Sequence, residues 1–508
     1  MKIILINLAI DSRTIGLLNV ATYLRAHGYK NTLIYYNIPH GVSQISQENI
    51  DALLSSIERL SPDIVGFSLT TVYFHIARQL TLGLKERLPS IITVWGGIHP
   101  TVAPQESLEH CDAACLAEGE EAFVDFIRNV DQKRDYHLTQ SFWVNYRNTI
   151  YKNEIRPLCA DLDSRPFPSP DWENSFLFDG TSLIPLSPQV LAAHSHIKGG
   201  MYDIMASRGC PFSCTYCCNS AFKRIYHGKG KILRFRSVQH VIAELTYALN
   251  TYPEIKIFNF QDDAFGAASE DYIQAFCDAY RREVHRSFHV RIIPTMINEK
   301  KIALLKEAGL MSAVMGLQSS DRMNKEIYHR PTDQKIFVNT AKMLHSNGIA
   351  GRYDVIIDNP YSTQEDEIEV INTFVDIPKP YHLYIYSLAF FPFTELTEKA
   401  IRDGTYNPTA SGYDHAYGNS DQHQFPILAQ ILEMTPFMPR WLIRWFLSIK
   451  DKKTGHTCIF FFYTYVFTIQ RLIITCIMKD SRRMLLVKKI SFTLLNLKRK
   501  LVGDHRYS

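Results

Sequence analysis

The first 130 residues alternate between two hydrophobic patterns. Short apolar runs, typical of strands buried on both faces of a parallel sheet, occur at residues 2–8, 32–36, 64–68 and 91–95. Stretches whose apolar residues recur with a helical period lie between them, at residues 16–27, 49–60 and 73–88. This regular alternation predicts an open, doubly wound α/β domain of Rossmann-like fold, whose ligands bind beyond the carboxyl ends of the strands.

A second series of strands and helices begins near residue 201. Its predicted strands lie at residues 202–206, 255–260, 290–294, 313–316, 352–357 and 382–388. Its predicted helices lie at residues 238–249, 299–308, 333–347 and 364–375. Six such units fit a partial (β/α)6 barrel of the TIM type, in which the active site lies at the carboxyl ends of the strands.

Two other stretches have a different composition. Tyr146–Asn153 resembles a hairpin and three prolines fall within Asp161–Pro170, so residues 136–200 predict a linker with a small ribbon. The last hundred residues are rich in aromatics and leucine and predict helices at 441–447, 458–478 and 484–501. The predicted domains are therefore residues 1–135, 136–200, 201–405 and a C-terminal helical region at 406–508.

Basic residues gather in that last region, at Lys479, Arg482, Arg483, Lys488, Lys489, Lys498, Arg499 and Lys500. Residues 458–478 approach the length of a membrane span, about 20 residues, but Gln470 and Arg471 interrupt them. We expect a helical lid or dimer surface whose basic face suits peripheral contact with a membrane. A true membrane span is the alternative interpretation.

The composition is that of a globular protein, at 46% hydrophobic and 21% charged residues. A net charge of +4 over 508 residues is too small to indicate a nucleic-acid partner. Ten cysteines without a regular framework fit a reducing compartment, and residues 1–7 show no cleavable leader. We therefore expect a cytoplasmic protein.

The chemistry centres on three cysteines, Cys210, Cys214 and Cys217. Their spacing suits a metal-binding loop that holds three irons of a [4Fe–4S] cluster and leaves the fourth iron open. Structural zinc is the first alternative, although zinc requires four ligands and no second pair lies nearby. A disulfide is less consistent with a long chain that has no leader.

Tyr216 completes the pattern Cys-x3-Cys-x-aromatic-Cys, and here the chain resembles the radical S-adenosylmethionine (radical SAM) superfamily. The resemblance implies that Cys210, Cys214 and Cys217 ligate the cluster and that S-adenosylmethionine chelates the open iron. It also implies that Tyr216 lies against the adenine. Cys218 falls outside the triplet and is interpreted as a small apolar residue.

Two further segments resemble the same superfamily. Asp262 and Asp263 lie in a Phe-x-Asp-Asp-x-Phe segment after the second barrel strand, which implies contact with the amino group of S-adenosylmethionine. Gln318 and Ser319 lie in a Gly-x-Gln-Ser segment after the fourth strand, which implies contact with the ribose and the methionine part. Helix capping is the alternative role for the paired acids.

Two single residues complete the expected S-adenosylmethionine site. Arg330 matches an arginine that commonly follows the Gly-x-Gln-Ser segment, and a surface arginine is the alternative. After the fifth strand the family usually shows Gly-x-Pro-Gly-Glu-Thr, whereas this chain lacks both glycines and the glutamate. Asp358 stands at that place and reaches a ligand with its carboxylate in this interpretation.

The first domain resembles the cobalamin-binding domain that precedes many radical SAM cores. The matching pieces, in order, are Ile15-Gly16-Leu17-Leu18, Tyr23-Leu24-Arg25 with Gly28, Gly96-Gly97 with His99 and Thr101, and Glu118-Gly119-Glu120. The resemblance implies a cobalamin site formed by Ser68, Thr70, Gly96, Gly97, His99, Glu118 and Gly119. A tight turn at the two glycines, and hydrogen-bonded rather than ligating roles for His75 and His99, are the alternatives.

Some cobalamin proteins supply the lower cobalt ligand from an Asp-x-His-x-x-Gly loop after the first strand. Residues 7–13 contain no histidine, so we expect cobalamin to bind here without a histidine ligand.

These resemblances imply an enzyme that cleaves S-adenosylmethionine to a 5′-deoxyadenosyl radical and methylates an unactivated carbon of a small molecule. They also imply an electron donor such as a flavodoxin or ferredoxin. Oxidative cyclisation or rearrangement is the alternative within the class. tRNA methylthiolation and a non-catalytic iron–sulfur or zinc protein are the alternatives outside it.

Overall fold

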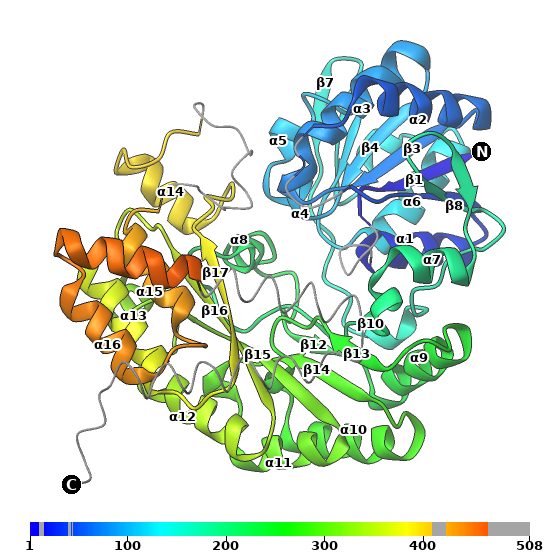
Figure 1. Ribbon diagram of the computed structural model, residues 1–508. Coiled ribbons are helices and arrows are strands. Elements are labelled where there is room, and N and C mark those ends of the chain that lie inside the picture. The colour runs from blue at the N-terminus through cyan, green and yellow to red at the C-terminus, as the bar shows by residue number, and fades with distance from the viewer. Residues whose placement is uncertain (10–14, 39–41, 43, 409–422, 466–508) are drawn as a thin grey trace, which may run out of the picture. The chain divides into compact units, whose positions relative to one another are not determined.

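The computed structural model describes residues 1–9, 15–38, 42, 44–408 and 423–465 (Figure 1). The chain divides into two compact units. The first contains residues 1–366 and 377–424, and the second contains residues 367–376 and the chain from 425 onward. The functional residues predicted above all lie in the first unit.

The N-terminal sheet has five parallel strands at its centre, in the order β5-β4-β3-β1-β2. They are β1 (Ile3–Asn7), β2 (Asn31–Tyr36), β3 (Ile64–Ser68), β4 (Ile92–Gly96) and β5 (Ala113–Cys115). The main helices between them are α1 (Ile15–Ala26), α2 (Gln47–Leu60), α3 (Phe74–Arg87) and α6 (Gly119–Asp131). The first three run close to their predicted ranges, whereas α6 was not predicted, and the predicted Rossmann-like domain is confirmed.

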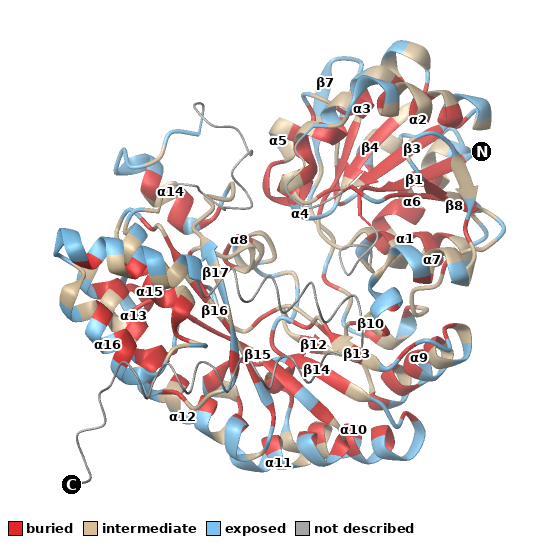
Figure 2. Cartoon of the chain, in the orientation of Figure 1, coloured by how far each residue is buried: buried red, intermediate tan, exposed pale blue. Residues whose placement is uncertain are grey.

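Both faces of this sheet are apolar because every central strand packs against helices on either side. Ile4 and Ile6 of β1 pack in the cluster that includes α2 and α3 residues, whereas Ile3 and Leu5 pack in the cluster that includes α1 and α6 residues. Figure 2 shows the central strands as buried. The continuous apolar run of β1 follows from this three-layer arrangement.

Residues 136–200, which we expected to be a linker with a small ribbon, add two strands to each edge of the same sheet. The predicted hairpin is β6 (Phe142–Tyr146) and β7 (Thr149–Lys152), with positive φ at Arg147 and Asn148 in its two-residue turn. It pairs with β5, while β8 (Ser175–Phe178) and β9 (Leu183–Pro185) extend the opposite edge beside β2. The sheet therefore has nine strands.

The second sheet has six parallel strands whose order in space equals their order in the chain. They are β10 (Met201–Ile204), β13 (Ile257–Phe260), β14 (Ser287–Arg291), β15 (Leu310–Gln318), β16 (Ala350–Ile357) and β17 (Tyr381–Ser387). The helices that follow them include α9 (Val238–Thr251), α10 (Glu270–Glu283), α11 (Glu299–Ala308), α12 (Gln334–Ser346) and α13 (Gln364–Asp376). This is the predicted partial barrel, with β14 three residues earlier than expected and α10 in addition.

The two faces of this sheet differ in chemistry. One face carries buried apolar side chains at alternate positions of the strands, namely Phe258, Val290, Met315 and Val355. On the other face, paired positions carry Asp203, Asn259, His289 and Ser312 from four neighbouring strands. The sheet thus has an apolar face typical of helix packing and a polar inner face.

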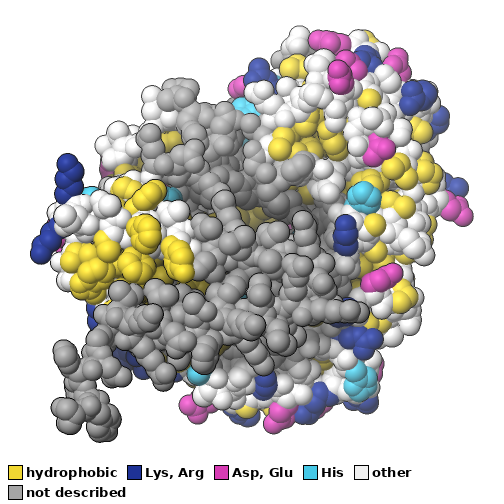
Figure 3. Space-filling view, viewed as in Figure 1, with side chains coloured by type: hydrophobic (Ala, Val, Ile, Leu, Met, Phe, Trp, Pro, Cys, Tyr) yellow, Lys and Arg dark blue, Asp and Glu magenta, His cyan; other side chains and the backbone are white. Residues whose placement is uncertain are grey.

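The described part of the second unit is helical, with α15 (Pro426–Met434), α16 (Arg440–Ile449) and a helix over residues 453–465. Trp441, Trp445, Phe460 and Phe461 are among its exposed aromatics, and Figure 3 shows hydrophobic side chains gathered on the surface of the molecule. The predicted helix at 484–501, the end of that at 458–478 and the basic cluster lie outside the described residues. Among the helices that are described, none has the length and hydrophobicity to cross a membrane.

Candidate active site

The cysteine loop starts at the carboxyl end of β10. The short strand β11 (Ser207–Arg208) pairs with β12 (Arg234–Phe235) and leads into Gly209, whose φ is +87°. A Cβ on Gly209 would lie 2.4 Å from the carbonyl oxygen of Ile232, so this approach requires glycine. The loop ends where α8 (Cys218–Ile225) begins.

The three predicted ligands occupy one protected loop. Cys210 and Cys214 are buried, and Cys217 is half-buried. Burial raises the pKa of the Cys210 thiol to about 11 and also raises that of Cys214. A hydrogen bond with the Cys218 thiol lowers the pKa of Cys217 to about 7.

The donor set of this loop fits a cubane cluster better than a single ion. Within the described ranges, no three His, Cys, Asp or Glu side chains converge on one metal position. A cubane does not require such convergence, because each cysteine ligates a different iron. Beyond burial, the neighbouring negative charges of Asp263, Cys217 and Cys214 also raise the pKa of Cys210.

Backbone hydrogen bonds hold the loop against the rest of the core. The amide of Thr215 donates to the carbonyl of Tyr328 at 3.0 Å, and its hydroxyl donates to the carbonyl of Ile327 at 2.6 Å. The amide of Leu396 donates to the carbonyl of Thr215 at 2.9 Å. Two segments distant in sequence, at residues 327–328 and at Leu396, therefore fix the middle of the cysteine loop.

Arg330 joins several of the predicted residues. Its guanidinium donates to the Tyr216 hydroxyl at 3.3 Å and to the Gly316 carbonyl at 2.9 Å, and it lies 3.9 Å from Sγ of Cys214. The Tyr216 ring contacts Tyr328 edge-on, with centroids 4.8 Å apart. A surface position for Arg330 is therefore wrong in this structure.

Gln318 and Ser319 follow at the end of β15. Gln318 has a φ of +73°, and the pairing register with β16 shifts between Gly316 and Gln318. The hydroxyl of Ser319 is buried and has no hydrogen-bond partner among the described residues. Since a buried hydroxyl without a partner costs free energy, this atom fits an absent ligand such as S-adenosylmethionine.

The paired acids point in different directions. Asp262 is fully buried and accepts hydrogen bonds from the Ala206 amide at 3.1 Å and from the Ser207 hydroxyl. Burial raises its pKa to about 6. Asp263 instead accepts from the Asn219 amide, which also donates to Sγ of Cys217 at 3.7 Å. Asp263 therefore lies beside the cysteine loop, while Asp262 supports the backbone that leads into it.

The carboxylate of Asp358 is occupied by the protein itself. It accepts from the Ser387 hydroxyl at 2.5 Å and from the backbone amide of Gln424 at 2.8 Å, and it lies 2.9 Å from Nδ1 of His423. In this structure Asp358 therefore joins the end of β16 to residues 423–424, rather than standing open toward a ligand.

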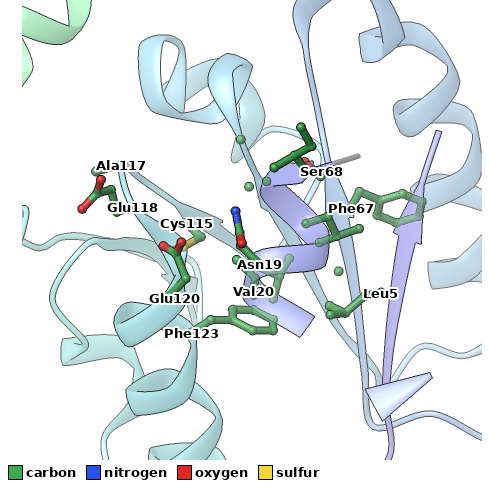
Figure 4. A pocket seen from close by; sticks show the side chains of 18 of the residues that line it. Leu5, Asn19, Val20, Phe67, Ser68, Cys115, Ala117, Glu118, Glu120 and Phe123 are labelled. Atoms are coloured by element: carbon green, nitrogen blue, oxygen red, sulfur yellow. The ribbon is translucent and has the colours of Figure 1, made fainter. Parts of the chain in front are cut away.

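A cavity of about 250 Å³ lies at the carboxyl ends of β1, β3 and β4 (Figure 4). Five of the predicted cobalamin contacts line it, namely Ser68, Gly96, Gly97, Glu118 and Gly119. Asn19 and Val20 of α1 line it from the helix side, and Phe123 of α6 closes another wall. The cavity thus lies where doubly wound sheets bind ligands.

Glycines line this cavity at positions where the surrounding chain leaves no room for a side chain. A Cβ on Gly66 would lie 3.0 Å from the Leu5 side chain, and a Cβ on Gly97, whose φ is +98°, would lie 2.8 Å from the carbonyl oxygen of Leu69. The Asn7 amide nitrogen, beside Ser68 in register, is buried without a hydrogen-bond partner among the described residues. A glycine-lined slot with an unpaired amide fits the buried nucleotide tail of cobalamin.

Two predicted cobalamin contacts do not line the cavity. Thr70 is absent from its walls, and so is His99, which is fully buried. Nδ1 of His99 lies 3.3 Å from the Thr71 hydroxyl, and its ring packs against Phe74 with centroids 4.9 Å apart. Burial lowers the pKa of His99 to about 4. His99 is therefore placed as a core histidine, the alternative stated above.

Glu118 lines the cavity, but its carboxylate contacts two arginines, which lie on the strands β11 and β12. Its carboxylate accepts from Arg234 at 2.8 and 3.1 Å and from Arg208 at 3.3 Å. It also accepts from the Cys159 amide at 3.0 Å. These charge-assisted bonds hold the pKa of Glu118 below its usual value, against the effect of burial. Its carboxylate therefore already has protein partners.

The sequence interpretation missed the charged residues of the polar inner face, Arg291, Arg352 and Asp354. A signal for them exists in residues 352–357, where Arg352, Asp354 and Ile356 alternate with Tyr353, Val355 and Ile357. Polar alternation in a parallel strand is unusual, because such strands are normally buried on both faces.

Comparison with known families assigns both halves of the chain. Residues 1–127 match the B12 binding domain, and residues 204–374 match the radical SAM superfamily. The chain therefore carries a B12-binding domain followed by a radical SAM domain. Its cofactors are a [4Fe–4S] cluster, S-adenosylmethionine and cobalamin.

Two relatives have sequences similar to this one. An anaerobic magnesium-protoporphyrin IX monomethyl ester cyclase of Rubrivivax gelatinosus is 24% identical over 68% of this chain and 59% of its own length. An uncharacterized methyltransferase of Pyrococcus horikoshii is 26% identical over 68% of this chain and 71% of its own length. The chain thus spans less than two thirds of the cyclase.

Solved structures share the fold. TsrM, a radical S-adenosylmethionine methyltransferase from Kitasatospora setae solved with cobalamin and a [4Fe–4S] cluster, has a TM-score of 0.62 at 13% identity, over 79% of this chain and 78% of that one. OxsB, a cobalamin-dependent S-adenosylmethionine radical enzyme, has a TM-score of 0.59 at 16% identity, over 84% and 57%. The chain thus shares its fold with cobalamin-dependent radical SAM enzymes, and its sequence is similar to proteins named as a methyltransferase and as a cyclase.

Proposed function

We propose that this enzyme methylates an unactivated carbon of a small molecule. The observation that carries the proposal is the pairing of two ligand-ready sites in one compact unit, the cysteine loop with Arg330 and the glycine-lined cavity at β1, β3 and β4. When bound, the cofactors supply radical hydrogen abstraction and a transferable methyl group. The methyltransferase names of two relatives support this outcome.

In this proposal Cys210, Cys214 and Cys217 ligate the cluster, and the remaining chain orients the ligands. Tyr216 and Arg330 form one wall of the S-adenosylmethionine site, because Arg330 already contacts the Tyr216 hydroxyl. Gln318, Ser319 and Asp263 supply polar contacts to it. Asn7, Ser68, Gly96 and Gly97 receive the nucleotide tail of cobalamin. An electron donor such as a flavodoxin or ferredoxin supplies the reducing electron.

The test begins with anaerobic reconstitution. Wild-type protein is expected to hold about four irons and four sulfides and to form 5′-deoxyadenosine from S-adenosylmethionine under reduction. Cys214→Ala should lose both, whereas Cys218→Ala should keep its iron, since Cys218 stands outside the ligand set. Stoichiometric zinc without broad visible absorption would contradict the proposal.

Methylation is separated from cyclisation by the mass of the product. The similarity to a cyclase makes radical ring closure the second candidate. Methylation adds the mass of one CH₂ group and consumes a methyl donor in step with product. Ring closure by oxidation removes hydrogen from the substrate and transfers no methyl group, although S-adenosylmethionine is still cleaved to give the radical.

A further inference from the structure

The polar inner face of the second sheet carries charges where barrels of this type usually carry branched apolar residues. In register, Arg291 of β14 lies beside Val314, and Val314 lies beside Arg352 of β16. One step toward the carboxyl ends, Asp354 lies between Gly316 and Tyr384. Charged groups inside a barrel are costly without a partner, so this face is organised for a ligand.

The two arginines have donors to spare. Within the described ranges, no hydrogen bond or ion pair engages the exposed Arg291. Arg352 donates to the Tyr384 hydroxyl at 2.8 Å, which leaves its other nitrogen donors available. A guanidinium presents paired donors that match the two oxygens of a carboxylate.

The spacing of the arginines suits one anionic group between them. Their strands are separated by β15, so their backbones lie about 10 Å apart at the usual strand spacing. Val314 stands between them and has a short side chain. An anion that reaches both guanidinium groups would therefore lie across β15.

Aromatic surface continues from the arginines. Tyr384 and Tyr386 point to the same face as Asp354 and are 37% and 50% exposed. Exposed tyrosines beside cations form a surface on which a flat apolar body packs. The face therefore offers separate places for an anion and for a ring system.

The same face leads to the cysteine loop. The positive charges of Arg291, Arg352 and Arg330 act on the Asp354 carboxyl, although burial still raises its pKa to about 6. Arg330 also reaches Cys214 and the carbonyl of Gly316, the neighbour of Asp354 in register. A ligand on this face would thus lie beside the proposed S-adenosylmethionine site.

We propose that this inner face is the substrate site and that it binds an aromatic carboxylate. The carboxylate lies between Arg291 and Arg352, and the ring packs on Tyr384 and Tyr386. The inference rests on the proposed function, because it places the substrate next to the site of radical formation.

The test uses two matched probes, 2-naphthoate and the neutral 2-naphthamide, titrated into anaerobically purified holoenzyme by calorimetry. The wild type should bind the carboxylate at least about tenfold more tightly than the amide. Arg291→Gln and Arg352→Gln should each weaken carboxylate binding by about tenfold and leave amide binding unchanged. The control Arg282→Gln, on α10, should bind both probes as the wild type does.

Equal affinity for the two probes, unchanged affinity in both arginine variants, or no detectable naphthoate binding would each overturn the inference. Arg291→Lys keeps the charge and should lose less affinity than Arg291→Gln, which separates a binding role from misfolding. Iron content and 5′-deoxyadenosine are measured on the same samples. If iron and 5′-deoxyadenosine formation are lost while the preference for the carboxylate probe is retained, the proposed function is refuted and the anion site is still supported.

Discussion

The Arg330 guanidinium lies 3.9 Å from Sγ of Cys214, although 116 residues separate them in sequence. A positive charge beside a cluster ligand favours the reduced, more negative state of the cluster. Arg330→Gln should therefore lower the reduction potential, measured by a redox titration followed by electron paramagnetic resonance. Arg330→Lys should lie nearer the wild type, and Arg128→Gln on α6 should not change the potential. An unchanged potential in Arg330→Gln would place the guanidinium outside the field of the cluster.

Filling the cavity of the first domain should exclude cobalamin. The Asn19 side chain points into that cavity, so Asn19→Trp should lower cobalamin loading by at least about tenfold while iron content stays constant. The matched control is Leu82→Trp, at a residue of α3 that is 48% exposed. Absorbance of bound corrinoid and iron analysis report the two outcomes.

Asn19→Trp is a cleaner change than Gly97→Trp. Any side chain at Gly97 would strain a backbone with φ of +98° and approach the Leu69 carbonyl. Equal cobalamin loading in Asn19→Trp and the wild type would move the corrinoid site away from this cavity. The bound corrinoid should also show a spectrum without histidine coordination.

Removing the charge of Glu118 should affect stability more than cobalamin binding. Glu118→Gln leaves the partly buried Arg208 and Arg234 without their shared carboxylate, at a cost of about 1–3 kcal/mol in unfolding free energy. The control Glu154→Gln removes an exposed partner of Lys229, and such a pair contributes about 0–1 kcal/mol. Thermal unfolding compares the two variants. A corrinoid affinity lost without a fall in Tm would restore Glu118 as a cobalamin contact.

The buried Asp262 should make stability depend on pH. Its pKa is about 6, against an ordinary 3.8 for an aspartate, so the folded state binds this proton more tightly than the unfolded state. Protonated Asp262 therefore stabilises the folded state fully below pH 3.8. This stabilisation, up to about 3 kcal/mol, is lost as pH rises through 6. Asp262→Asn keeps a hydrogen-bonding group without the charge. From pH 5 to pH 7, the Tm of this variant should rise relative to the Tm of the wild type.

Asp354 titrates in the same range, but it is present in both proteins and cancels in the comparison. A Tm difference that does not change with pH would show that Asp262 keeps an ordinary pKa in the folded protein.

Sequence patterns located the elements whose signal is local. The apolar run of β3, at Ile64–Ser68, was predicted with the bounds observed, because a strand between two helix layers must be apolar throughout. The hairpin near Tyr146–Asn153 was also predicted, and the structure places its two-residue turn at Arg147 and Asn148, both with positive φ. The cysteine spacing was sufficient to locate the loop of the candidate site.

Features that depend on distant partners could not be predicted. β8 is a short strand whose place is set by β2, and the pair Leu33 and Ser175 is far apart in sequence. Glu118 was assigned to cobalamin because its arginine partners are Arg208 and Arg234, which lie in another domain. Asp262 and Asp263 are neighbours whose different surroundings follow from the alternation of side chains at a strand end.

The nine-stranded sheet has a consequence for synthesis on the ribosome. β2 is complete at Tyr36, yet its outer partner β8 begins only at Ser175, after the whole of the central sheet has been translated. Until then the nascent chain presents β2 as a bare edge with unpaired amides and carbonyls. Such edges template wrong pairings in incomplete chains. The first domain therefore reaches its native sheet only after residue 185 has left the exit tunnel, and β2 stays an exposed edge throughout that interval.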